Sequence, residues 1–86
     1  MTEQDKFVLI TGSAGGIGKA CVAHFARQGW RVIGIDKNDF GDGFPVSGLF
    51  FRADISRAEE FSTIYHKVAA FTPYLNALVN NAAVQI

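Results

Sequence analysis

The fold is decided by Phe7-Val8-Leu9-Ile10-Thr11-Gly12-Ser13-Ala14-Gly15-Gly16-Ile17-Gly18, an apolar run that ends in a glycine-rich turn. The apolar half is typical of a strand buried on both faces of a sheet. The glycines allow the backbone to approach a ligand that a Cβ atom would hold away. A helical pattern begins at Gly16, so its unpaired N–H groups and positive dipole end face the same turn. This arrangement suits the diphosphate of a nucleotide.

Two common phosphate-binding motifs fail on spacing. A P-loop requires Gly, four further residues and then Gly-Lys-Ser/Thr. Gly18-Lys19 is present, but Ser13 occupies the place of the first glycine and Ala20 that of the hydroxyl residue. The pattern G-x-G-x-x-G is absent as well, because three residues separate Gly12 from Gly16. A tight strand-to-helix turn without any ligand therefore remains an alternative interpretation of the glycines alone.

The composition indicates one small globular domain. The chain has 86 residues, of which 49% are apolar and eight are Phe, and its formal net charge is zero. A chain of this size buries only about 60% of its unfolded surface, so its core is expected to be marginal. The balanced charge gives no reason to expect binding to nucleic acid or to an anionic membrane. The single cysteine, Cys21, excludes an internal disulfide and a cysteine metal cluster, and no metal ligands are assigned.

The N-terminal residues and the length of the apolar runs bear on location. The polar start, Met1-Thr2-Glu3-Gln4-Asp5-Lys6, does not resemble a signal peptide. No apolar run approaches the roughly 20 residues that are needed to span a bilayer. We therefore expect a cytoplasmic protein.

Apolar runs and turn residues predict alternating strands and helices. Strands are expected at 6–11, 30–36, 48–52 and 75–80, and helices at 16–28 and 56–71. This alternation is typical of a parallel sheet with right-handed crossovers. Residues 37–47 differ, because two Gly, one Pro and several Asn or Asp oppose a helix. We expect an irregular loop there, with Phe40 and Phe44 covering the sheet face that a helix would normally cover.

Each predicted helix has an apolar side that is expected to face the core. In the first helix, Ile17, Cys21 and Phe25 lie four residues apart. The second helix is expected to begin with a capping box from Ser56 to Glu59. Its apolar residues then follow at helical spacing: Phe61, Ile64, Tyr65 and Val68.

Asp36 ends the second predicted strand, roughly 20 residues after the glycine turn, where dinucleotide-binding folds place the carboxylate that holds the adenosine ribose. Asp54 stands in the same relation to the third strand. An Asp at a strand end is often only a turn former. Beside the glycine turn, we favour the ribose role for Asp36.

In combination, Thr11–Gly18, Asp36, Asp54 and the run Leu78-Val79-Asn80-Asn81-Ala82-Ala83 are far more specific than the glycines alone. With these pieces the chain resembles the N-terminal half of a short-chain dehydrogenase/reductase, and the resemblance covers nearly its whole length. It implies an α/β fold of Rossmann type, with two main helices and four parallel strands that lie in the order 3-2-1-4. Residues 1–86 would form one NAD-binding half of such a domain.

The resemblance implies a role for each matching position. Gly12, Ile17 and Gly18 would line the pyrophosphate, and Asp36 would bind the hydroxyls of the adenosine ribose. Asp54 and the backbone of Ile55 would border the adenine. Asn80 and Ala82 would approach the ribose on the nicotinamide side. The expected cofactor-binding set is Gly12, Ser13, Gly16, Ile17, Gly18, Asp36, Lys37, Asp54, Ile55, Asn80 and Ala82.

The sequence favours NAD(H) over NADP(H). The Asp36 carboxylate can accept hydrogen bonds from both ribose hydroxyls and would repel a 2′-phosphate. The glycine turn holds Ala14-Gly15 where a basic residue would favour NADP(H). Lys37 beside Asp36 weakens the distinction, but NAD remains the predicted cofactor.

The catalytic Ser and Tyr-x-x-x-Lys of the family are not found. Tyr65 is followed four residues later by Ala69 and Tyr74 by Leu78, and we expect Tyr65 to be a core residue. No catalytic residue is assigned, and we expect this segment alone to be inactive. The whole enzyme would transfer hydride between the nicotinamide and an alcohol or carbonyl substrate.

The fourth strand is expected to be an exposed apolar edge of the sheet, which favours pairing with another chain. The protein would then form a homo-oligomer or need its missing C-terminal half. Two alternatives stay open: a non-catalytic NAD-binding or dimerising module, and a structural remnant that binds nothing.

Overall fold

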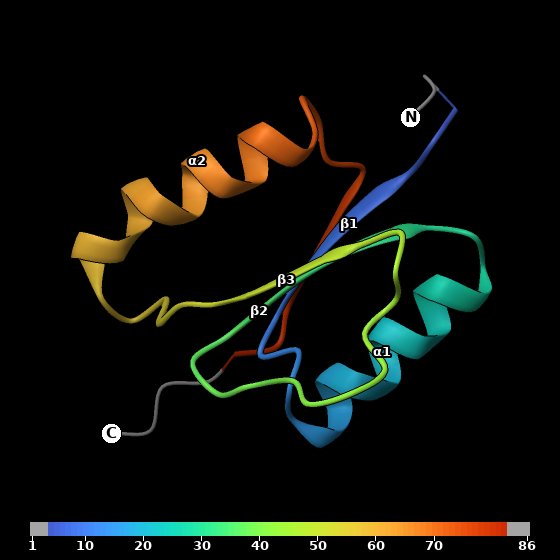
Figure 1. The fold of residues 1–86 in the computed structure, drawn as a ribbon, viewed down its shortest axis with the longest axis horizontal. Coiled ribbons are helices and arrows are strands. Elements are labelled where there is room, and N and C mark those ends of the chain that lie inside the picture. The colour runs from blue at the N-terminus through green and yellow to red at the C-terminus, as the bar shows by residue number, and fades with distance from the viewer. Residues whose placement is uncertain (1–3, 83–86) are drawn as a thin grey trace.

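The structure, a computed structural model, describes residues 4–82 of the chain, which form four parallel strands and two α-helices (Figure 1). In chain order the elements are β1 (Phe7–Thr11), α1 (Gly16–Arg27), β2 (Arg31–Asp36), β3 (Leu49–Arg52), the 3₁₀ turn η1 (Ala58–Glu60), α2 (Phe61–Phe71) and β4 (Ala77–Asn80). The strands lie in the order β3-β2-β1-β4, which confirms the predicted Rossmann-type sheet. No helix in this part of the chain is long and apolar enough to cross a membrane.

The sheet is the middle layer of three, with α1 on one face and α2 on the other (Figure 1). β1 lies between β2 and β4, and Leu9 pairs with Ile33 on one side and with Leu78 on the other. Alternate side chains of the strands point to opposite faces. Two apolar clusters result. Val8, Ile10, Val22, Val32 and Phe40 form the cluster on the α1 side, and Ile33, Ile35, Phe51 and Ala53 form the cluster on the α2 side.

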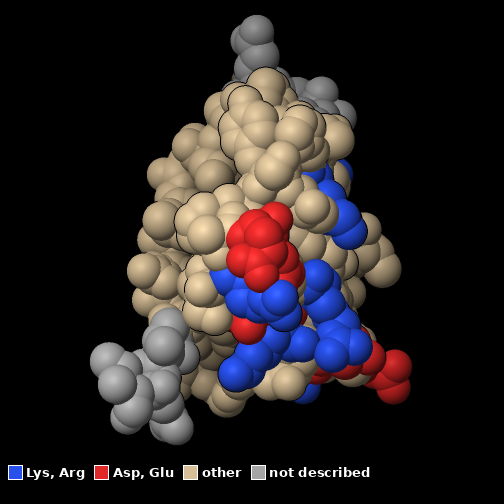
Figure 2. Space-filling model, turned by 90° about the vertical axis from the view of Figure 1, so that its left-hand side faces the viewer, with Lys and Arg blue, Asp and Glu red and all other residues tan. Residues whose placement is uncertain are grey.

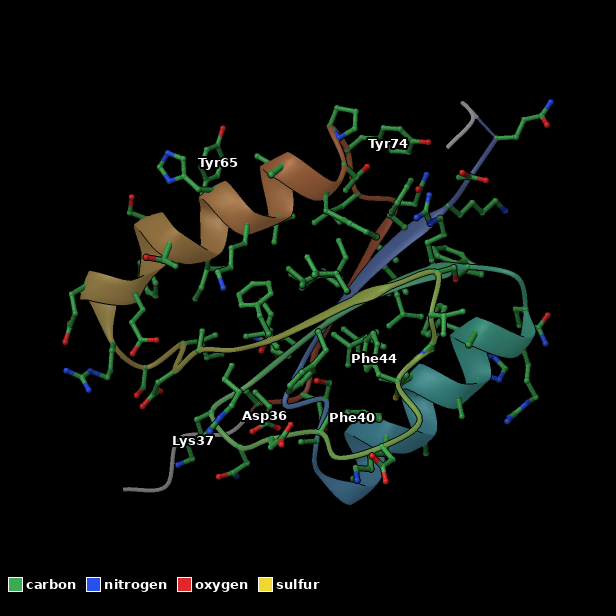
Figure 3. All side chains as sticks on the ribbon, viewed as in Figure 1. Asp36, Lys37, Phe40, Phe44, Tyr65 and Tyr74 are labelled. Carbon is green, nitrogen blue, oxygen red and sulfur yellow. The ribbon has the colours of Figure 1, made fainter. Side chains whose placement is uncertain are left out.

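The crossover from β2 to β3 contains no helix, as predicted. Phe40 is 6% exposed and Phe44 packs against the same cluster. Their ring centroids are 4.9 Å apart, and each lies 5.6 Å from the ring of Phe50 in β3. Figure 3 shows both loop side chains within the curve of the loop, and they pack on the face of the sheet that α1 covers. Three aromatic rings therefore cover the sheet where a second helix would otherwise lie.

The predicted inward faces of the helices are partly wrong. In α1 the buried residues are Gly18 and Val22, whereas Ile17 is 72% exposed. In α2 no residue is fully buried, and the side chain of Tyr65 points away from the sheet and is 69% exposed (Figure 3). The residues of α2 that pack against the core are Ile64, Val68 and Phe71. Their spacing makes a narrow stripe, and Tyr65 lies one residue, about 100°, outside it.

The predicted capping box at Ser56 is also wrong. The hydroxyl of Ser56 donates a 2.6 Å hydrogen bond to Oδ1 of Asp54 instead of binding a helix N–H group. The chain then forms the turn η1, and α2 begins only at Phe61. An ionised carboxylate two residues away is a stronger acceptor for the hydroxyl than a hydroxyl is for a backbone N–H. The side chain of Glu60 also binds a residue that precedes the turn, since its Oε1 accepts the N–H of Asp54 at 3.0 Å.

Candidate functional site

A cavity of about 580 Å³ opens at the carboxyl ends of the strands, beside the glycine turn. It is lined by Gly12, Gly15, Ile35, Asp36, Lys37, Asn38, Ala53, Asp54, Ile55, Ser56, Asn81 and Ala82. Ligands of open parallel sheets bind at this end, where the strand order reverses. Figure 2 shows Lys and Arg side chains beside Asp and Glu side chains on this face of the molecule.

The glycine turn is held tightly against its surroundings. Gly12 has a positive φ of 66°, and a Cβ atom there would lie 3.0 Å from the backbone of Ala82. A Cβ atom on Gly18 would collide with the carbonyl oxygen of Gly12 and would lie 2.8 Å from Cα of Ser13. The first turn of α1 has no side-chain cap and no acidic residue. Its N–H groups are therefore available to an anion.

Asp36 is bound to the glycine turn. Its Oδ2 accepts the backbone N–H of Ala14 at 2.9 Å, and its Oδ1 accepts that of Asn38 at 2.8 Å. A carboxylate offers about four lone-pair directions, so the two oxygens can each accept one further hydrogen bond. The half-buried carboxylate lines the cavity and can bind a pair of hydroxyl groups there.

The ends of β1 and β4 are joined by one hydroxyl group. Oγ1 of Thr11 donates to Oδ1 of Asn80 at 3.0 Å and accepts the N–H groups of Asn81 at 3.1 Å and of Ala82 at 3.2 Å. Nδ2 of Asn81 also donates to the carbonyl oxygen of Gly12 at 3.2 Å. These bonds fix the backbone of Ala82 against the glycine turn, at the wall of the cavity.

Asp54 supplies a second carboxylate. The hydroxyl and the N–H group of Ser56 both donate to it. These two hydrogen bonds, the hydroxyl's more than the N–H group's, lower the pKa of Asp54 from the usual 3.8, and the positive charges of Lys37 and Arg57 contribute less. The group is therefore ionised at neutral pH. It stands at the end of β3, beside Ile55, as Asp36 stands at the end of β2.

The structure brings together part of the predicted set. The predicted residues that line the cavity are Gly12, Asp36, Lys37, Asp54, Ile55 and Ala82. The others lie beside or beneath it. Ser13 is fully buried under the turn, and Gly18 supports it from α1. Gly16 and Ile17 are exposed at the start of α1, and the side chain of Asn80 is bound to Thr11.

Sequence reasoning missed several lining residues, namely Gly15, Ile35, Asn38, Ala53, Ser56 and Asn81. Each is adjacent in the sequence to a predicted site residue. Nearness to the end of a strand was therefore the signal that could have identified these residues. The two tyrosines lie elsewhere. Tyr65 is on the outer side of α2, and the hydroxyl of Tyr74 donates to the carbonyl oxygen of Asp5 at 2.7 Å, at the opposite end of the sheet (Figure 3).

Comparison with known proteins agrees with this geometry. Residues 6–86 match the family model described as short chain dehydrogenase. The chain therefore belongs to the short-chain dehydrogenase family.

Individual relatives show how much of such a protein the chain represents. An uncharacterized oxidoreductase of Schizosaccharomyces pombe is 40% identical over 82 residues, which are 95% of this chain and 31% of the relative. An NAD-dependent glycerol dehydrogenase of Listeria innocua is 31% identical over 95% of this chain and 34% of its own length. A short chain dehydrogenase from Leptospira borgpetersenii, solved with bound NAD+, is 28% identical with a TM-score of 0.83, over 96% of this chain and 33% of that one. The chain spans about a third of the length of these relatives.

Proposed function

We propose that this chain is the NAD-binding half of a short-chain oxidoreductase. The observation that carries the proposal is the hydrogen bond from the N–H of Ala14 to Asp36, because it joins the glycine turn to the end of β2 at the wall of one cavity. A diphosphate at the turn and a ribose at the carboxylate would then belong to the same ligand. Bound NAD(H) would supply the hydride-accepting or hydride-donating ring.

The residues that we expect to hold NAD follow from their places around the cavity. The uncapped N–H groups at the start of α1 would bind the pyrophosphate, because those of Ser13, Ala14 and Gly15 already donate to Ile35, Asp36 and Gly12. Asp36 would accept the two hydroxyls of the adenosine ribose, and Asp54 with Ile55 would border the adenine. The nicotinamide ribose would lie toward Ala82 and Asn80. The positions of Asp36 and Asp54 at the cavity wall support this orientation.

The carboxylate of Asp36 favours NAD(H), because a 2′-phosphate beside it would be repelled. Lys37, which follows Asp36 and also lines the cavity, acts in the other direction because its positive charge would attract a 2′-phosphate. Titration of the chain with NADH and with NADPH, followed by the change in cofactor fluorescence, tests the assignment. We expect tighter binding of NADH. Tighter binding of NADPH would overturn the choice of cofactor, and binding of neither would overturn the proposed function.

We further propose that hydride transfer to or from an alcohol or carbonyl group needs a second part that supplies the catalytic residues. In residues 4–82 neither tyrosine lines the cavity. β4 is at the edge of the sheet, and its Leu78 is 62% exposed. This edge suits the addition of further parallel strands.

A non-catalytic module that pairs through the same edge is the second candidate, favoured by the exposed Leu78. Adding the remaining two-thirds of the S. pombe relative as a separate polypeptide distinguishes the two. NAD-dependent oxidation of alcohols by the mixture, absent from either piece, supports the enzyme. NADH binding with no activity in the mixture supports the module.

A further inference from the structure

Gly34 has no side chain, and this leaves a space on the surface of the sheet below the glycine turn. It lies in the middle of β2, where it pairs with Ile10 of β1 and Phe50 of β3. A Cβ atom on Gly34 would lie 2.7 Å from Cε1 of Phe44 and 2.8 Å from Oγ of Ser13. A ring from the β2–β3 crossover and a side chain from the glycine turn therefore both lie over the same residue, on the α1 side of the sheet.

Ser13 is held in this place by packing. Its side chain is fully buried, and its hydroxyl has no hydrogen-bond partner among the residues that the structure describes. Its backbone N–H donates to the carbonyl oxygen of Ile35 at 3.2 Å. A buried hydroxyl without a partner adds no directional bond to hold the turn. The backbone bond to Ile35 joins the turn to β2, and packing beneath and beside the side chain of Ser13 supplies the rest of its support.

Phe44 is the group that fills this space from the crossover. Its ring packs edge-on against Phe40, 4.9 Å between centroids, and is tilted against Phe50 at 5.6 Å. Phe40 is in turn covered by the ammonium group of Lys19 in α1, 4.9 Å from its ring centre. The ring of Phe44 is thus fixed on its far side and meets Gly34 on its near side.

We propose that Phe44 is a positioning residue for the glycine turn. Its ring and Ser13 share the space over Gly34, so the ring, together with the hydrogen bonds of Ser13 and Ala14, sets the position of the backbone of residues 12–15. The loop that replaces the second crossover helix thereby supports the cavity as well as covering the sheet. The consequence for cofactor affinity rests on the proposed function, whereas the support of the turn does not.

Amide hydrogen exchange tests the support directly, without any cofactor. The amides to follow are those of Ser13 and Ala14, which are bonded to Ile35 and Asp36. In Phe44→Leu we expect their exchange to be roughly tenfold faster relative to the core amides of β1. The matched control is Phe25→Leu, which alters a half-buried ring of the same cluster that packs on Trp30 rather than on Phe44 and should leave this ratio unchanged. Equal ratios in the two variants would overturn the proposal.

A double-mutant cycle provides a second test that does not depend on one variant's stability. Gly34→Ala adds a methyl group in the space that Phe44 and Ser13 occupy, so it should also accelerate exchange at Ser13. Combining it with Phe44→Leu should restore part of the protection, because the smaller side chain makes room for the methyl group. Purely additive effects would overturn the contact.

NADH affinity measured on the same variants separates this inference from the proposed function. If the unaltered chain binds NADH, Phe44→Leu should weaken binding roughly fivefold and Phe25→Leu much less. Unchanged affinity in Phe44→Leu would overturn the link to the cofactor. If the unaltered chain binds no NADH, the proposed function fails, and the exchange ratios still decide whether Phe44 supports the turn.

Discussion

Ala14 and Asp36 are joined by a 2.9 Å hydrogen bond from the backbone nitrogen of the first to Oδ2 of the second. The bond crosses from the glycine turn after β1 to the end of β2. It gives the carboxylate two tasks, because the same group that faces the cavity also holds the turn that forms its wall. Removing this carboxylate should therefore affect both the cavity and the stability of the turn.

The first prediction concerns that carboxylate. Asp36→Ala should raise the dissociation constant of NADH roughly tenfold or more, since two charge-assisted hydrogen bonds are lost. It should also lower the free energy of unfolding by about 1–3 kcal/mol, because the N–H of Ala14 loses its acceptor in a partly buried place. Fluorescence titration and urea unfolding measure the two effects.

Asp39→Ala is the matched control for Asp36. Asp39 is an exposed loop carboxylate that accepts the N–H of Gly41 at 3.3 Å, as Asp36 accepts that of Asn38. It does not line the cavity. Equal loss of NADH affinity in both variants would contradict a ribose-binding role for Asp36.

The second prediction separates two glycines of the turn. Gly18→Ala places a methyl group against the carbonyl of Gly12, so the turn or the helix has to shift. We expect a loss of about 1–3 kcal/mol in unfolding free energy, as for overpacking, with weaker NADH binding. Gly16→Ala has open space around the new methyl group and should be neutral or stabilising by up to about 1 kcal/mol. Similar stabilities for the two variants, measured by thermal unfolding, would refute the packing argument.

The third prediction is a pH dependence. Ser56→Ala removes the hydroxyl that contributes most to the lowered pKa of Asp54, so this pKa should rise toward 3.8. A carboxyl whose pKa is lower in the folded state stabilises the fold above its unfolded pKa, and this contribution is lost as the pH falls through the folded value. The variant should therefore lose stability relative to the parent at neutral pH, and the difference should vanish in strong acid.

An NMR titration of the Asp54 carboxyl carbon measures the shift directly. Ser62→Ala, which removes an exposed hydroxyl on α2, is the control and should leave the pKa of Asp54 unchanged. If the Ser56 variant titrates like the parent, the hydrogen bond between Ser56 and Asp54 does not persist in solution.

The fourth prediction concerns the exposed edge of the sheet. We expect the chain to self-associate at high concentration, because β4 is an edge strand of the sheet that residues 4–82 form and carries the exposed Leu78. Leu78→Lys should shift the protein toward the monomer in sedimentation velocity runs. Val46→Lys, at a fully exposed apolar residue in the crossover loop, should not. A parent chain that stays monomeric at high concentration would argue against this use of the edge.

The parallel strands could be predicted from the pattern of the chain, and their order 3-2-1-4 was implied by the resemblance to the family. Buried parallel strands are continuous apolar runs, and right-handed crossovers leave few ways to arrange them. The loop aromatics Phe40 and Phe44 could be predicted for a similar reason, since an uncovered sheet face needs apolar cover. Asp36 could be placed near the turn because carboxyl ends of parallel strands share one edge of the sheet.

The faces of the helices and the local turns could not be predicted as well. Periodicity shows that Ile17 and Tyr65 lie on an apolar side, but not how wide a stripe the neighbouring layer covers. The predicted capping box at Ser56 was wrong because Asp54 accepts the hydrogen bond of the Ser56 hydroxyl. Whether this bond forms depends on local geometry. The prediction that includes Ala83 falls outside the residues that the structure describes.

The bonds of Thr11 join residues that are 69 to 71 positions apart in the chain. Contacts this distant close late in folding, because the entropy of forming the intervening loop has to be overcome first. On a ribosome, β1 emerges long before its partner β4, so the wall of the cavity formed by Asn81 and Ala82 is completed last. A nascent chain should therefore be unable to recruit the nucleotide as a folding aid until nearly all of this segment has left the exit tunnel.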